Sequence, residues 1–105
     1  MIMCGCMVQE AQIPDHQIEL LEAGLSELSS RHFGEPASTI WTTVASGDGW
    51  TAGQPSSTSL VVMYVPEGLD QEARTGLLKS ICDLWSETTG CSINEIVATA
   101  RDQIE

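Results

Sequence analysis

Residues 58–65, TSLVVMYV, contain an unbroken apolar run from Leu60 to Val65. Successive side chains of a β-strand point to opposite faces of a sheet, so this strand would be apolar on both faces. Strands of that kind belong to sheets that are covered on both sides. The run therefore predicts a central strand that is buried on both faces.

The opening residues, MIMCGCMV at 1–8, have the same character. The even positions from Cys4 to Val8 would point to one face, and Met3 and Met7 would point to the other. We expect a strand over 2–8. Two further β-like segments, STIWTTVA and NEIVATA, predict strands over 38–45 and 94–100.

Two amphipathic helices are expected between these strands. Residues 15–33 and 70–89 carry apolar side chains at alternating spacings of three and four, which is typical of one helix face. Gly34 and Gly90 stand where a helix commonly ends. The two apolar stripes consist of Ile18, Leu21, Leu25 and Leu28 in the first helix, and of Ala73, Leu77, Ile81, Leu84, Trp85 and Thr88 in the second.

The order β-α-β therefore occurs twice, and we expect a single α+β domain over residues 1–105. Its halves, 1–46 and 57–102, would be joined by the Gly-rich loop 46–57, in which Asp48-Gly49 suits a tight turn. Gly34 and Gly90 are 56 residues apart (from 34 to 90). The same offset of 56 aligns further similar residues of the two halves, which favours a duplicated unit. The aligned pairs are Met7/Met63, Leu21/Leu77, Leu25/Ile81, Leu28/Leu84, Ile40/Ile96 and Thr43/Thr99.

The handedness of the crossovers predicts the layers. Each β-α-β crossover should be right-handed and join parallel strands. In a pseudo-symmetric four-stranded mixed sheet of this order, both helices lie on one face. The other apolar face would be left bare, and bare apolar areas of this size mark interfaces. We expect another copy of the chain to cover it.

The composition limits the classes of binding partner and the cellular compartment that we expect for this chain. Fifteen acidic and four scattered basic side chains give a net charge of −11, which argues against nucleic acid as a partner. No apolar run is long enough to span a bilayer. The opening residues have no basic start like that of a secretory signal. We expect a cytoplasmic protein without membrane contact, whose four cysteines are reduced thiols.

The chain resembles the tautomerase superfamily over nearly its whole length. The likeness is clearest in GWTAGQPSSTSLVVMYVPEGLDQEARTGLLKSICDLWSETTGCSINEIVATARD (49–102), which is similar to the second half of the proteins like macrophage migration inhibitory factor. The Gly-containing loop, the apolar strand, the LLKSICDLW helix and INEIVATARD carry it. The resemblance implies a homotrimer with pockets between subunits. It also implies tautomerisation or related isomerase, decarboxylase or dehalogenase chemistry on small carbonyl compounds.

The N-terminus departs from the family pattern. The family uses an N-terminal proline, exposed after removal of the initiator methionine, as general base or acid. Here residue 2 is Ile2, whose size disfavours that removal, so we expect Met1 to be retained. Met1 would then offer a primary amine as the catalytic group. An ordinary α-amine has a pKa of about 7.7–8.0, which suits proton transfer near neutral pH, and a primary amine can also form an imine.

The supporting positions depart as well. Glu35, in GEP, stands where relatives like macrophage migration inhibitory factor have the lysine of GKP, and Trp41 falls where bacterial 4-oxalocrotonate tautomerases have an arginine. Both changes remove positive charge that would hold a carboxylate. By position, the pocket rim would consist of Tyr64, Val65, Val97 and Thr99. The expected partner is a small carbonyl compound that is not a dicarboxylate.

Other motifs give little support to other chemistry. The Cys4-x-Cys6 pair lacks a nearby second pair of ligands, so no metal site is expected. The loop GDGWTAG lacks the Gly-Lys-Ser/Thr of a phosphate-binding loop. We expect no cofactor.

Three hypotheses follow. The first is a divergent keto–enol isomerase that uses the Met1 amine. The second is a non-catalytic homotrimer with a binding or structural role. The third is a ferredoxin-like small-molecule binding module, which shares the order of elements.

Overall fold

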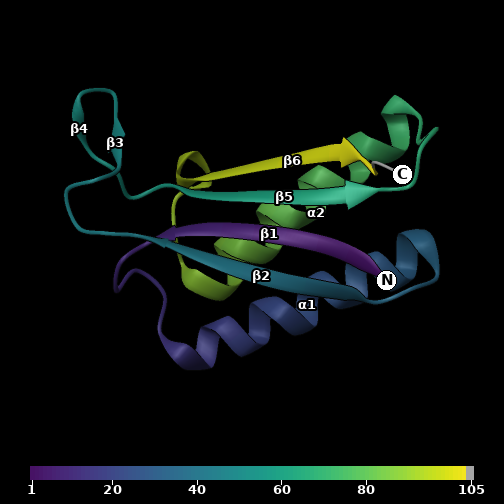
Figure 1. Cartoon of the computed structure of the whole chain (residues 1–105), viewed down its shortest axis with the longest axis horizontal. Coiled ribbons are helices and arrows are strands. Elements are labelled where there is room, and N and C mark those ends of the chain that lie inside the picture. Colours follow the sequence, from purple (N-terminus) through teal and green to yellow (C-terminus); the bar gives the residue numbers. More distant parts are fainter. Residues whose placement is uncertain (104–105) are drawn as a thin grey trace.

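Four long strands and two helices make up the fold of residues 1–103, which are the residues that the computed structural model describes (Figure 1). The elements follow in the order β1 (Ile2–Gln9), α1 (Asp15–Phe33), β2 (Ala37–Val44), β3 (Trp50–Thr51), β4 (Gln54–Pro55), β5 (Ser59–Val65), α2 (Gln71–Thr89), the short 3₁₀ helix η1 (Ile93–Glu95) and β6 (Ile96–Asp102). The six elements predicted from the sequence are confirmed, with boundaries that shift by two residues or fewer.

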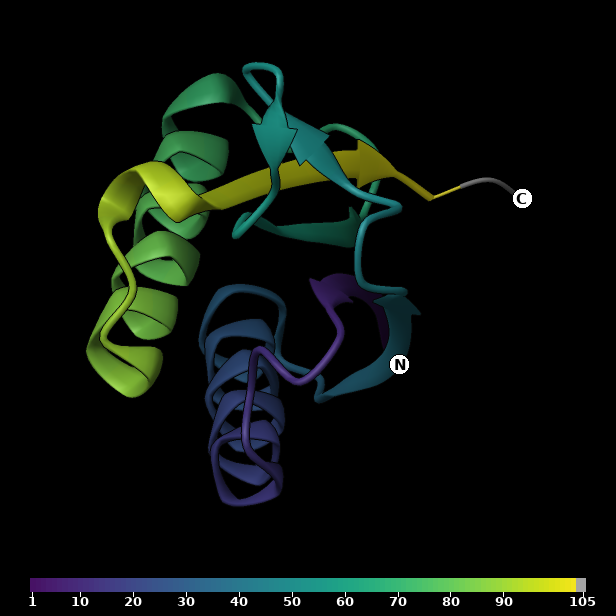
Figure 2. The same cartoon turned by 90° about the vertical axis from the view of Figure 1, so that its left-hand side faces the viewer.

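The sheet has the order β2-β1-β5-β6. The pairs β1/β2 and β5/β6 are parallel, and the central pair β1/β5 is antiparallel. Both helices lie on the same face of this sheet (Figure 2). The expected α+β architecture is confirmed. A ferredoxin-like plait pairs its second and third strands, whereas here the second strand, β2, pairs with β1 at an edge, so the topology is not that of a ferredoxin-like plait.

The core lies between the sheet and the two helices. On β1 the even-numbered residues face the helices, and on β5 the odd-numbered residues do so, because buried positions alternate along both strands. Leu21 and Leu25 of α1 and Leu77 and Ile81 of α2 are fully buried against them. Burying such a side chain stabilises the fold by about 1.5–3 kcal/mol, so the predicted helix stripes form the core.

Gly34 and Gly90 end the helices as expected. Both adopt left-handed backbone angles, with φ of 74° and 75°, and their N–H groups donate to Ser30 O and Ser86 O, each at 2.9 Å. A residue with a β-carbon would be strained in this conformation. The helix ends are thus encoded locally.

The offset of 56 residues holds for the helices but not for the strands. Leu21 and Leu77 are both fully buried. In contrast, Met7 is 42% exposed whereas Met63 is buried, and Ile40 is 57% exposed whereas Ile96 is buried. Helix-facing residues are even-numbered in β1 and odd-numbered in β5, so an even offset exchanges the two faces. The strand matches do not join equivalent positions.

The segment between β2 and β5 forms a small hairpin, β3–β4, that projects beyond the sheet (Figure 1). Its turn lies at Ala52-Gly53, whose φ values of 52° and 77° are both positive, as a type I′ turn requires. Asp48 instead closes a separate turn, in which its N–H donates to Ala45 O at 2.9 Å. Neither helix of the described residues is long and apolar enough to cross a membrane.

Candidate active site

The face of the sheet away from the helices carries an open groove of about 780 Å³. Its floor comes from β1, β2 and β5, and Met1 and Gln103 also line it. Among the described residues that line it there is no Lys, Arg, His, Asp or Glu, so apart from the Met1 amine the groove is mainly apolar. The main floor residues are Met3, Met7, Ile40, Leu60, Val62 and Tyr64. We call the whole face of the sheet that points away from the helices the open face.

Gly5 lies at the centre of the open face. It pairs with Ile40 on β2 and with Val62 on β5. A β-carbon at this position would meet nothing within 4 Å. A glycine inside a strand is unfavourable unless something approaches closely. The chain itself leaves that space open, so the groove has room for a ligand or for a neighbouring chain.

The α-ammonium group of Met1 forms an ion pair with the Glu35 carboxylate. The two residues meet because β1 and β2 run parallel from adjacent starting points: Ile2 pairs with Ala37, and Ile2 N–H donates to Pro36 O at 3.0 Å. The side chain of Met1 is 59% exposed and that of Glu35 is 42% exposed. The amine therefore lies in water at one end of the groove, with a carboxylate as its partner.

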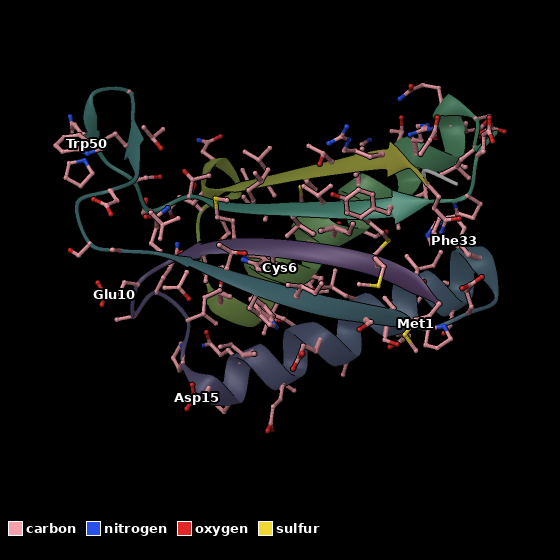
Figure 3. All side chains as sticks on the ribbon, in the orientation of Figure 1. Met1, Cys6, Glu10, Asp15, Phe33 and Trp50 are labelled. Carbon is pink, nitrogen blue, oxygen red and sulfur yellow. The ribbon has the colours of Figure 1, made fainter. Side chains whose placement is uncertain are left out.

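The end of α1 positions Glu35. After the left-handed turn at Gly34, the Ser29 hydroxyl donates to Glu35 O at 2.7 Å. Ser29 is itself fully buried. Its hydrogen bond thus fixes the backbone of Glu35 against the helix, while the carboxylate remains free to reach Met1. In Figure 3, Met1 and the end of α1, marked by Phe33, lie at one end of the sheet, and Trp50 on the hairpin lies at the other.

Tyr64 is the other predicted site residue that lines the groove with Met1. Two hydrogen bonds from Gln103 reach the backbone at this end of β5. Gln103 N–H donates to Val65 O at 2.9 Å, and Gln103 Nε2 donates to Tyr64 O at 3.4 Å. These bonds fold the segment after β6 over the end of β5 and place Gln103 at the groove.

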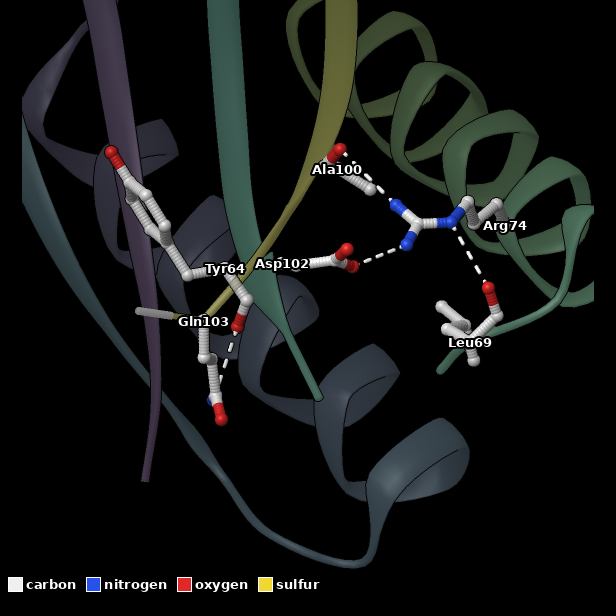
Figure 4. A network of polar contacts seen from close by, with 6 residues as sticks. All are labelled: Tyr64, Leu69, Arg74, Ala100, Asp102 and Gln103. Carbon is white, nitrogen blue, oxygen red and sulfur yellow. Dashed lines mark hydrogen bonds and ion pairs between the residues drawn. The ribbon is translucent and has the colours of Figure 1, made fainter. Parts of the chain in front are cut away.

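An arginine network holds the end of β6 in place (Figure 4). Arg74 of α2 donates to Leu69 O at 3.1 Å and to Ala100 O at 3.3 Å, and it forms an ion pair with Asp102. Its side chain is 21% exposed. Arg74 is therefore engaged on the helix side of β6 and is not a free cation for the groove.

The remaining predicted site residues do not join this group. Val97 and Thr99 pair with Leu60 and Val62 and so lie on the open face one strand further out. Trp41 pairs with the buried Cys6 and therefore faces the helices, where its ring lies 5.9 Å from that of Trp85. Val65 is fully buried on the same side. In a single chain, neither Trp41 nor Val65 reaches the groove.

Several groove residues were not identified from the sequence. Met3, Met7, Leu60 and Val62 were recognised as apolar strand positions, but not as parts of a site. Strict alternation from Tyr64 would have found Leu60 and Val62. No sequence pattern indicates Gln103 as a groove residue, because only its hydrogen bonds to β5 bring it to the groove.

Cys4 and Cys6 belong to the strand that lines the groove, but they are buried at positions that face the helices. Cys4, Cys6, Cys82 and Cys91 are free thiols. A hydrogen bond with Cys4 and burial both raise the pKa of Cys6, so it stays a neutral thiol. Burial, followed by the charge of Asp83, raises the pKa of Cys82. Within residues 1–103, no group of three His, Cys, Asp or Glu side chains is arranged to hold a metal ion.

Solved structures resemble this chain over nearly its full length, whereas no protein-family model and no curated protein sequence matches it. The crystal structure of native Ps01740 is 21% identical, with a TM-score of 0.90 over 96% of this chain and 93% of that one. Pt0534 inactivated by 2-oxo-3-pentynoate is 20% identical, with a TM-score of 0.86 over 96% and 85%. A fused 4-OT wild-type symmetric trimer is 19% identical, with a TM-score of 0.84 over 96% and 85%.

These identities are low, so the likenesses bear on the fold and not on the activity. The shared fold includes the four-stranded mixed sheet and both helices. It agrees with the resemblance found in the sequence from residue 49 onward. This chain therefore has the fold of the tautomerase superfamily.

Proposed function

We propose that this chain is a divergent tautomerase-superfamily isomerase that moves a proton next to the carbonyl group of a small compound. The observation that carries the proposal is the Met1–Glu35 ion pair at the end of an apolar groove. If the family resemblance extends to the site, the amine at the start of β1 would take the part of the catalytic proline.

The Met1 amine and the Glu35 carboxylate together can act as an acid–base pair. When the ammonium group passes a proton to Glu35 or to solvent, the neutral amine can take a proton from the carbon beside a carbonyl. The apolar groove would hold the body of the substrate, and Tyr64 would offer a hydroxyl to its oxygen. A flexible methionine amine holds its geometry less firmly than a proline ring, so we expect modest turnover.

We propose a homotrimer as the active assembly. The helices cover only one face of the sheet, and the open face exposes Met3, Met7 and Ile40, each at 40% or more. One of the similar structures is named as a symmetric trimer. In such an assembly, neighbouring chains would cover the open face and complete the pocket beside Met1, where residues of β6 such as Val97 and Thr99 could contribute.

Ketonisation of phenylpyruvate tests the proposal, and the dicarboxylate 2-hydroxymuconate is the comparison substrate that we expect to turn over more slowly. The protein is first measured by intact mass, which shows whether Met1 is present with a free amine. Turnover is then measured before and after selective acetylation of that amine. We expect acetylation to abolish turnover. Turnover that survives acetylation would remove Met1 from the mechanism.

A specific observation also favours the second hypothesis, a non-catalytic binding or structural trimer. Met1 is 72% exposed and its amine already has a carboxylate partner, so in a single chain it is neither desolvated nor fixed. A trimer that does not catalyse ketonisation would support that role. Binding of phenylpyruvate that does not change when the Met1 amine is acetylated would support it further.

A further inference from the structure

We propose that the Met1–Glu35 pair forms imines with small neutral aldehydes and ketones, with Glu35 as the group that shuttles the proton. The inference rests on the proposed function for its site but concerns a different reaction. Three observations carry it: the Met1 amine is primary, the Glu35 carboxylate forms an ion pair with it, and the groove beside both groups is mainly apolar.

The chemistry balances with the groups present. The Met1 ammonium gives a proton to the Glu35 carboxylate, and the freed amine adds to the carbonyl carbon to form a carbinolamine. Protonated Glu35 then returns its proton to the carbinolamine oxygen, and the C–O bond breaks. The products are a protonated imine, one water molecule and the regenerated carboxylate. A secondary amine such as proline gives only an iminium ion, whereas the iminium ion of a primary amine can lose its N–H proton and become a neutral imine.

The geometry at Glu35 favours this role over a purely structural one. Its backbone is fixed by the buried Ser29, yet its side chain is 42% exposed. Among the hydrogen bonds and ion pairs of the described residues, its carboxylate meets only the amine. A general acid or base must lie within hydrogen-bonding reach of the proton that it moves, and the ion pair meets that requirement.

The charges select the class of carbonyl compound. Glu35 repels a carboxylate that approaches the amine, and the groove residues provide no cation. Arg101 of β6 is the cross-strand neighbour of Tyr64, so it lies on the open face one strand beyond the groove and is not among the residues that line it. The apolar floor favours an alkyl chain. A neutral aldehyde should therefore react faster than an otherwise similar aldehyde that carries a carboxylate.

The sequence permits a direct experiment, because Lys79 is the single lysine. In a Lys79→Arg protein, the Met1 α-amine is the only primary amine that can be trapped. Intact mass first establishes that the chain starts with an unmodified Met1; any other start overturns the proposal. The protein is then incubated with butanal or with succinic semialdehyde in the presence of cyanoborohydride. The rate of the single adduct is followed by mass and mapped to the Met1 peptide.

Glu35→Gln in the same background is the decisive variant, and Glu19→Gln, an exposed position on α1, is the matched control. We expect trapping at Met1 to slow by about tenfold or more in Glu35→Gln, since acid–base assistance contributes roughly 10² or more, and to be unchanged in Glu19→Gln. Equal or faster trapping in Glu35→Gln, or faster reaction of succinic semialdehyde than of butanal, overturns the inference.

Ketonisation measured on the same samples separates this inference from the proposed function. Ketonisation without a trapped adduct means that the amine acts only as a base, and the inference fails alone. An adduct that forms with assistance from Glu35 but without ketonisation means that the isomerase proposal fails alone.

Discussion

Asp70 begins α2 with a side-chain cap that α1 lacks. Its Oδ1 accepts a hydrogen bond from Ala73 N–H at 2.8 Å, whereas Pro14 at the start of α1 offers no side-chain acceptor. We predict that Asp70→Ala lowers the free energy of unfolding by about 1 kcal/mol. Chemical denaturation measures this change. Asp48→Ala removes the same charge in the loop and should change stability by less than about 0.5 kcal/mol; equal losses would contradict the cap.

Cys4 and Cys6 differ from Cys82 and Cys91 in their access to solvent. The first two are 1% and 2% exposed, whereas the other two are partly exposed. We predict that iodoacetamide modifies Cys82 and Cys91 slowly in the native protein at pH 8, Cys82 the more slowly because burial raises its pKa. Cys4 and Cys6 should react only on unfolding, since an alkylating reagent cannot reach them in the core. Peptide mapping after timed labelling measures this order, and early labelling of Cys6 would contradict the described core.

The two helices approach each other closely at Gly24. A β-carbon there would lie 2.5 Å from Leu84 Cδ1 of α2, whereas at Gly76 it would meet nothing within 4 Å. We predict that Gly76→Ala raises the free energy of unfolding by about 0.5–1 kcal/mol, because alanine is the better helix former. Gly24→Ala should instead lower it by about 1 kcal/mol, because Leu84 has to move.

Each glycine variant serves as the control for the other, since both make the same change inside a helix. Thermal and urea unfolding at a fixed protein concentration measure both. Stabilisation by both variants would mean that α1 and α2 are further apart than described. The pair therefore tests the packing of the elements separately from their helix propensity.

At the scale of the whole molecule, the main feature is the open face, an apolar surface that the helices leave uncovered. Ile40 on that face and Leu20 on the outer side of α1 are both 57% exposed. We predict that Ile40→Glu weakens self-association by at least a hundredfold, about 2.8 kcal/mol, because a charge would be buried in the interface. Leu20→Glu should leave it unchanged.

Sedimentation equilibrium over a range of concentrations measures the association. The wild-type chain should approach three times its mass of 11.3 kDa, and Ile40→Glu should sediment as the monomer at concentrations where Leu20→Glu is still assembled. A wild-type monomer at all concentrations, or equal weakening by both variants, would contradict the open face as the site of assembly.

The sequence by itself determined the elements and the layers. Helix periodicity, two terminating glycines and the handedness of β-α-β crossovers are local or general properties, so helices 15–33 and 70–89 and their common face followed from them. The sequence also indicated Met1, Glu35 and Tyr64 for the site.

Only the tertiary structure decided which face each strand residue occupies and which distant residues meet. A strand's side chains alternate with a period of two, so a shift of one residue moves every side chain to the other face. For this reason Trp41 and Val65 lie among the helices and not with Tyr64, and the repeat offset fails in the strands. Likewise, the Met1–Glu35 ion pair exists because parallel pairing of β1 with β2 joins two chain segments that the whole of α1 separates.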